Sequence, residues 1–167
     1  SKKKATSKKK AASKRKAASE KKAVSKKEPL GHLPDPPGLE PPEPSRLRVL
    51  VVDDEPEIIE IVEPFLRALG HQVDSAEDGD AALEKILTER PDVVLLDVMM
   101  PGLNGWEICR YVRERKELDA VRIIMATGMG EEMNAATSPL YGADTYLDKP
   151  FDLRELEQAI VDVRRAR

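Results

Sequence analysis

From about residue 46 onward, the chain alternates between short apolar runs and longer segments with helical periodicity. The runs 49–52, 93–96 and 123–126 are continuously apolar, as is typical of parallel strands buried on both faces. Ranges 72–76 and 145–147 complete a set of five predicted strands. Helices are predicted over 56–69, 80–89, 105–115, 131–141 and 152–166. This alternation predicts a doubly wound α/β fold, with a five-stranded parallel sheet and helices on both faces.

Two prolines fall inside predicted helices. Pro64 lies within 56–69, and Pro139 lies within 131–141. A proline in a helix interior removes one hydrogen bond and costs about 3 kcal/mol. We therefore expect the first helix to be bent or broken and the fourth to be shortened.

The charge distribution divides the chain into three parts. Residues 1–28 contain 13 basic and 2 acidic side chains, a net charge of +11, whereas residues 46–167 carry a net charge of −11. Residues 29–45 hold seven of the thirteen prolines. Dense like charges repel and cannot bury apolar surface, and proline favours extended chain. We predict a disordered basic tail over 1–28, a proline-rich linker over 29–45 and one folded domain over 46–167.

The tail is low in complexity and resembles the lysine-alanine tails of linker histones. Such cations neutralise nucleic-acid phosphates without reading sequence, and no aromatic residue interrupts them to stack on bases. One hypothesis is therefore nonspecific binding of DNA or another polyanion. The alternatives are a solubilising arm, an arm that rests on the acidic domain, and contact with anionic lipid. The candidate binding residues are Lys2, Lys3, Lys4, Lys8, Lys9, Lys10, Lys14, Arg15 and Lys16.

Several protein classes are disfavoured by composition. The single cysteine, Cys109, excludes an intrachain disulfide framework. No apolar run reaches the length of a membrane span, and no apolar segment of a secretory signal follows the basic residues. We expect a cytoplasmic protein that is not integral to a membrane, with nucleoid association as a further possibility if the tail binds DNA.

Three acidic side chains stand where predicted strands end. Asp53 and Asp54 follow the run 49–52, and Asp97 follows 93–96. The carboxyl ends of parallel strands meet at one edge of the sheet, where ligands bind. Converging carboxylates repel one another, and a hard cation relieves that repulsion. Because Mg²⁺ prefers a few carboxylates together with water and phosphate oxygens, the three residues predict a Mg²⁺ site.

The next two strands end in residues suited to a phosphoryl group. Thr127 is a hydroxyl donor and Lys149 is a mobile cation, and both can bind phosphoryl oxygens. With Asp97 as nucleophile, the set is complete for phosphoryl transfer. Each residue taken alone has an ordinary structural explanation, such as a helix cap or a solvated charge. Their joint placement at strand ends favours the functional interpretation.

Four segments resemble the signature segments of response-regulator receiver domains, in order and at the usual separations. They are VLVVDDEPE, LLDVMMPGLNG, IIMATG and GADTYLDKPFDLREL, and the resemblance spans about 47–163. It implies a flavodoxin-like strand order of 2-1-3-4-5. It also implies that the bond between Lys149 and Pro150 is cis.

The resemblance also implies roles for individual residues. Asp97 is the expected phosphoacceptor, and the expected metal ligands are Asp53, Asp54, Asp97 and the main-chain carbonyl of Met99. Thr127 and Lys149 are expected to bind the phosphoryl group, and Thr127 and Tyr146 to act as switch residues. Met99 and Met129 occupy positions that flank the hydrolytic water in this family. Thioethers orient water poorly, so we predict a long-lived phosphorylated state.

The expected function is that of a stand-alone bacterial response regulator, since no effector segment follows Arg167. The phosphodonor would be a sensor histidine kinase or a phosphotransfer protein. Output would pass to a protein partner through the face formed by 131–141, 145–147 and 152–166. The chain is not expected to be an enzyme beyond its own phosphorylation and dephosphorylation. The alternative is a nucleic-acid-associated protein whose tail binds DNA under control of the receiver.

Overall fold

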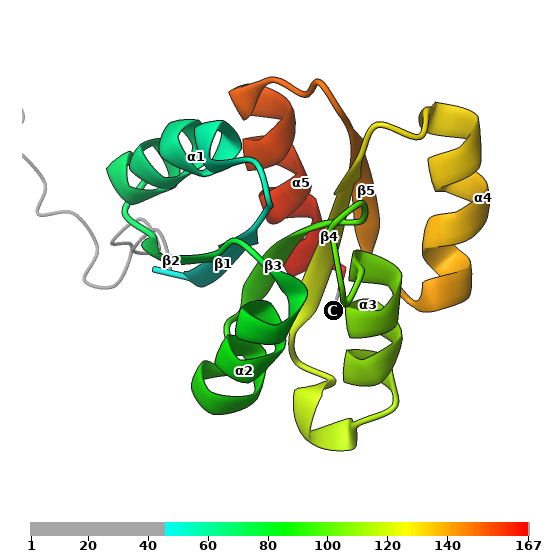
Figure 1. Ribbon diagram of the computed structural model, residues 1–167. Helices are drawn as coiled ribbons and strands as arrows, with labels where there is room; N and C mark the ends of the chain where they lie inside the picture. The colour runs from blue at the N-terminus through cyan, green and yellow to red at the C-terminus, as the bar shows by residue number, and fades with distance from the viewer. Residues whose placement is uncertain (1–45, 167) are drawn as a thin grey trace, which may run out of the picture. The chain divides into compact units, whose positions relative to one another are not determined.

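The computed structural model describes residues 46–166, without the side chains of Glu131 and Ser138. Five strands alternate with five helices and one short 3-10 helix (Figure 1). The strands are β1 (Arg48–Val52), β2 (Gln72–Ala76), β3 (Val93–Asp97), β4 (Arg122–Thr127) and β5 (Thr145–Asp148). The helices are α1 (Pro56–Ala68), α2 (Gly79–Glu89), α3 (Gly105–Arg113), η1 (Lys116–Leu118), α4 (Glu131–Tyr141) and α5 (Leu153–Arg165).

All neighbouring strands pair in parallel, in the order β2-β1-β3-β4-β5. Both the predicted fold class and the predicted strand order are confirmed. The order reverses between β1 and β3, and doubly wound sheets form their ligand crevice at such a point. Val52 pairs with Leu96 there, so the residues that follow Val52 lie beside Asp97 at the end of β3.

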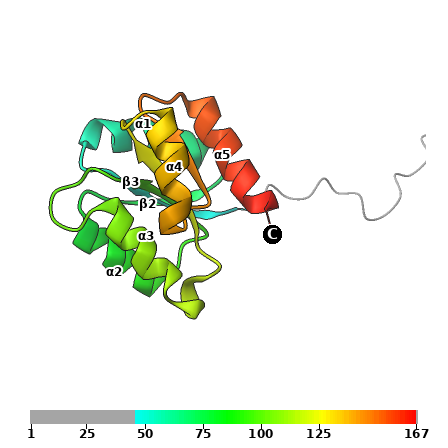
Figure 2. The same cartoon turned by 90° about the vertical axis from the view of Figure 1, so that its right-hand side faces the viewer.

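Alternate residues of the strands feed two apolar layers, because successive side chains of a strand point to opposite faces. Leu50 and Leu96 belong to the layer packed against α2 and α3, whereas Val51 and Leu95 belong to the layer packed against α1 and α5. The turned view shows these helix pairs on opposite sides of the sheet (Figure 2). The continuous apolar runs in the sequence reflect this burial on both faces.

Helix α3 is shorter than the predicted range 105–115. It ends at Arg113, and η1 follows with Leu118 only 1% exposed. Burying Leu118 requires the chain to turn back toward the core, which ends the helix. The start of α3 agrees with the prediction, since the Asn104 side chain accepts a hydrogen bond from the Glu107 amide and Glu107 bonds back in a capping box.

The expected break of the first helix and the expected shortening of the fourth are not observed, whereas a bend at Pro64 stays a prediction. Helix α1 is continuous through Pro64, and α4 continues past Pro139 to Tyr141. Pro64 is exposed, as is Glu60, whose carbonyl would otherwise accept the missing bond. Water can bind that carbonyl. Three buried side chains, Ile59, Val62 and Leu66, hold α1 against the sheet on both sides of the proline.

The Lys149–Pro150 peptide bond is cis, as expected from the resemblance. Among the described residues, no helix is long and apolar enough to cross a bilayer. The predicted tail and linker, including all nine candidate basic residues, lie outside the described residues.

Candidate phosphorylation site

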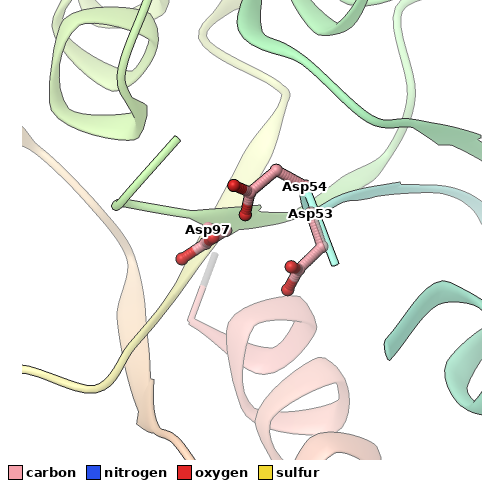
Figure 3. Close-up of side chains that lie close together, drawn as sticks. All are labelled: Asp53, Asp54 and Asp97. Carbon is pink, nitrogen blue, oxygen red and sulfur yellow. The ribbon is translucent and has the colours of Figure 1, made fainter. Parts of the chain in front are cut away.

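Three carboxylates gather where β1 and β3 end (Figure 3). Asp53, Asp54 and Asp97 each offer one oxygen within 4.8 Å of the others. Asp53 and Asp97 are 2% and 3% exposed, whereas Asp54 is open to solvent. The parallel pairing of β1 with β3 brings these residues together, although more than forty positions separate them in the sequence. Mg²⁺ in proteins usually keeps several waters and binds a few carboxylates, so these three oxygens could hold such an ion.

The environment of Asp97 disfavours its ionised form. Burial raises the pKa of Asp97 to about 6; the Lys149 ammonium opposes this shift, and the Asp53 charge adds to it. The Met99 amide donates a hydrogen bond of 3.3 Å to Asp97 Oδ1. Removing a charge from water is costly unless it is paired, and a cation at this position would offset the cost.

Lys149 supplies the positive charge of the site. Its Nζ lies 2.7 Å from Asp53 Oδ2, 3.4 Å from Glu55 Oε1 and 3.6 Å from Asp97 Oδ1. Burial alone would lower the pKa of Lys149, but the hydrogen bond and charge of Asp53, with Asp97 and Glu55, outweigh it and raise the pKa. Lys149 is therefore a protonated ammonium held between the two buried carboxylates.

Thr127 is the last residue of β4 and is fully buried. Its Oγ1 accepts a hydrogen bond of 3.3 Å from the Met129 amide, so the hydroxyl proton can be donated elsewhere. Its main-chain oxygen accepts a 3.0 Å bond from the Lys149 amide, which ties the ends of β4 and β5 together. The structure thus places Thr127 and Lys149 at the same sheet edge as the carboxylates.

The strand ends are held closely by the loops and helices that follow them. The side chain of Asp53 accepts a 3.0 Å bond from the Glu55 amide, just before α1 begins. At Gly105, the first residue of α3, a Cβ atom would lie 2.3 Å from the Asp97 carbonyl oxygen. Only glycine allows α3 to start this close to the end of β3.

A family model described as the response regulator receiver domain matches residues 49–161. The chain belongs to this family. The match begins in β1 and ends inside α5, so it includes all of the acidic, hydroxyl and lysine residues at the sheet edge. The predicted family is therefore confirmed for the folded domain.

Relatives of known sequence and structure agree with this assignment. The chain is 43% identical to the transcriptional regulatory protein ResD of Bacillus subtilis over 112 residues, which are 67% of this chain and 45% of ResD. The chemotaxis response regulator CheY4 of Vibrio cholerae is 32% identical, with a TM-score of 0.67 covering 71% of this chain and 99% of CheY4. The BeF3-activated receiver domain of DrrB, from Thermotoga maritima, is 29% identical. The match has a TM-score of 0.64 and covers 72% of this chain and 98% of the DrrB chain.

Other predicted residues of the receiver domain lie nearby, with their roles still predictions. Tyr146 in β5 is half-buried and packs against the apolar layer on the α2 and α3 side. Met99 and Met129 are 68% and 41% exposed. Cys109 is buried in the core, where burial raises the pKa of its thiol to about 11.

Two residues near the site are not among the predicted site residues. Glu55 contacts the Lys149 ammonium, and Asn134 in α4 is fully buried against the ends of β4 and β5. Glu55 adjoins the acidic pair, and this adjacency is a usable sequence signal. A polar residue in a weakly patterned helix gives no comparable signal, so the burial and contacts of Asn134 can be recognised only in the folded structure.

Proposed function

We propose that this receiver domain accepts a phosphoryl group on Asp97 and uses the modified state to control protein contacts. The observation that carries the proposal is the buried Asp97 carboxylate at the end of β3, with two further carboxylates, a lysine and a hydroxyl at the same edge. A pKa of about 6 leaves this carboxylate mostly ionised at neutral pH, as a nucleophile requires.

In the proposed reaction, an Asp97 carboxylate oxygen forms a bond to phosphorus while the bond from phosphorus to the donor's leaving group breaks. The product is an acyl phosphate on Asp97, and the leaving group departs from the opposite side. Lys149 moves its contact from the carboxylate of Asp97 to a phosphoryl oxygen. The Thr127 hydroxyl donates a hydrogen bond to another phosphoryl oxygen. Both donors stabilise charge at the transferring group, beside the buried side chains of Asp53 and Asp97.

The donor set fits Mg²⁺ because it consists of hard oxygen ligands with one side open to solvent. Asp53, Asp54 and Asp97 would hold the ion, together with the main-chain carbonyl of Met99. When bound, the ion neutralises negative charge on the transferring oxygens. Lys149 remains necessary because the buried carboxylates and the incoming phosphoryl group together carry more negative charge than one divalent ion offsets.

The test is phosphorylation by a small donor. Wild-type protein and the Asp97→Asn variant are incubated with acetyl phosphate, with Mg²⁺ or with EDTA, and phosphoryl addition is followed by intact mass. We expect labelling of the wild type only, and only with Mg²⁺. Asp144→Asn is a matched control, because it removes a carboxylate from the opposite end of the strands and should leave labelling unchanged. Labelling of Asp97→Asn at the wild-type level would refute the proposal.

Within the proposal, a histidine kinase or a phosphotransfer protein supplies the phosphoryl group, and a protein partner binds the face formed by α4, β5 and α5. The chain spans about half the length of ResD, so any output in transcription remains a proposal. The stand-alone character, the three-part division of the chain and DNA binding by residues 1–28 also stay predictions.

A further inference from the structure

Helix α4 is attached to the sheet differently from the other four α-helices of the described residues. Those helices bury apolar side chains, whereas the only buried side chain described in α4 is that of Asn134, at 0% exposure. Met133 and Leu140 on the same helix are 49% and 80% exposed. Apolar burial therefore contributes little to holding α4, and the polar contacts of Asn134 contribute correspondingly more.

Asn134 joins α4 to the ends of the two strands that carry the phosphoryl-binding residues. Its Nδ2 donates to Asp148 Oδ1 at 2.5 Å and to the Thr127 carbonyl oxygen at 3.5 Å. Thr127 and Asp148 are direct register partners across β4 and β5, and Lys149 follows Asp148. Both partners of Nδ2 are acceptors, so rotating the amide would place its oxygen against a carboxylate. The hydrogen bonds thus define the orientation of the side chain.

The other end of this amide is unsatisfied. Asn134 Oδ1 is buried and has no hydrogen-bond partner within residues 46–166. An unpaired buried acceptor is destabilising, and most such groups find a partner. In the observed position of α4, Asn134 therefore donates two hydrogen bonds, while its Oδ1 accepts none within residues 46–166. A second position of α4, in which Oδ1 gains a protein donor or a water, would recover the cost of this missing bond. The free-energy difference between the two positions is therefore smaller than it would be for a fully paired side chain.

The far end of α4 contacts the only tryptophan of the chain. The Tyr141 ring lies 4.5 Å from the Trp106 ring in α3, and the Tyr141 carbonyl accepts a 3.2 Å bond from Cys109 Sγ. Displacement of α4 at Asn134 therefore changes the surroundings of Trp106. This contact provides an optical signal for the position of the helix.

We propose that Asn134 is a positioning residue that couples the phosphorylation site to α4 through Thr127 and Asp148. The inference rests on the proposed function. When Thr127 and Lys149 turn toward a phosphoryl group on Asp97, the strand ends move, the two bonds of Asn134 are strained, and α4 shifts to its second position. The chemistry at Asp97 does not involve Asn134, so removing the side chain uncouples α4 from the site without preventing phosphorylation.

The test compares four variants in the full chain. Asn134→Ala removes both bonds, and Asn134→Asp places a second carboxylate beside that of Asp148. The double variant Asn134→Asp/Asp148→Asn restores a bond with donor and acceptor exchanged. Thr137→Ala is the control, because it removes a hydroxyl that donates a 2.7 Å bond to the Met133 carbonyl within α4. Labelling by acetyl phosphate and Mg²⁺ measures the site. Amide hydrogen exchange over 131–142 and Trp106 fluorescence, with and without beryllofluoride and Mg²⁺, measure α4.

In wild type and Thr137→Ala, we expect both α4 readouts to change on adding beryllofluoride. In Asn134→Ala and Asn134→Asp, labelling should stay within about twofold of wild type, while the α4 response falls at least about fivefold, the lower range of allosteric coupling. The double variant should recover part of the response. A wild-type response in Asn134→Ala, or a labelled wild type whose α4 does not respond, would overturn the coupling alone. Absence of labelling in wild type would refute the proposed function as well.

Discussion

Replacing Asp97 with asparagine is expected to stabilise the metal-free protein. The Asp97 carboxyl is 3% exposed and lies within 4.8 Å of the carboxylates of Asp53 and Asp54. Asparagine has nearly the same shape and retains an acceptor for the Met99 amide, but it carries no charge. Asp53 keeps its 2.7 Å contact with Lys149, so the substitution leaves no buried carboxylate without its cation.

The magnitude follows from the raised pKa of Asp97. Burial, opposed by Lys149 and increased by Asp53, raises this pKa from 3.8 to about 6. One pKa unit corresponds to about 1.4 kcal/mol, so ionisation of Asp97 costs the fold up to about 3 kcal/mol. That is a large share of a typical domain stability of about 5–15 kcal/mol.

The sign of the pH dependence follows from the same shift. Because the folded-state pKa is raised, the folded protein retains a proton that the unfolded chain has already released. The associated stability is fully present below about pH 4 and is lost as the pH rises through about 6. The higher free energy of unfolding of Asp97→Asn relative to wild type should therefore be absent near pH 4 and reach its full value by about pH 7.

Urea unfolding followed by circular dichroism, from about pH 5 to pH 8 in EDTA, measures this difference. Asp144→Asn is a control for which we expect the opposite change in the free energy of unfolding. Its carboxylate pairs with Arg113 at 2.6 Å and Arg122 at 2.9 Å, so neutralising it should destabilise the protein. Mg²⁺ should reduce the difference in free energy of unfolding between wild type and Asp97→Asn, because it stabilises the protein with all three carboxylates. If Asp97→Asn is no more stable than wild type at pH 7 in EDTA, burial and the Asp53 charge do not make ionised Asp97 costly to the fold.

Four further outcomes are expected. Burial lowers the pKa of His71, so its contribution to stability should be present above about pH 6.5 and be lost as the pH falls below it; a stability profile that is unchanged in His71→Gln would contradict this. Gly105→Ala should destabilise by about 1–3 kcal/mol and reduce labelling of Asp97, because the new Cβ meets the Asp97 carbonyl; wild-type unfolding and labelling would refute it. Met99→Asn should shorten the lifetime of the acyl phosphate, measured by loss of label, and an unchanged lifetime would count against the thioether argument. Deleting residues 1–28 should abolish any salt-dependent retardation of unrelated DNA fragments; retardation that persists would place the binding elsewhere.

The sequence by itself determined the fold and most of the acidic site. Continuous apolar runs require strands buried on both faces, and alternation with helical segments requires a parallel sheet, so residues that end such runs must meet at one edge. The strand-end pattern therefore predicts that Asp53, Asp54, Asp97, Thr127 and Lys149 are neighbours, and the structure places them at one sheet edge.

The tertiary structure decided what local patterns could not. Pro64 and Pro139 each remove one helix bond, but both helices continue. At Pro64, the packing of α1 against the sheet and solvent access outweigh the local preference. Helix α3 ends early because Leu118 is buried. Asn134 has no sequence signal, since its importance depends on two strand ends that approach it only in the folded chain. Sequence periodicity reports which face of an element is buried, whereas the partners of a single buried polar group are set by long-range packing.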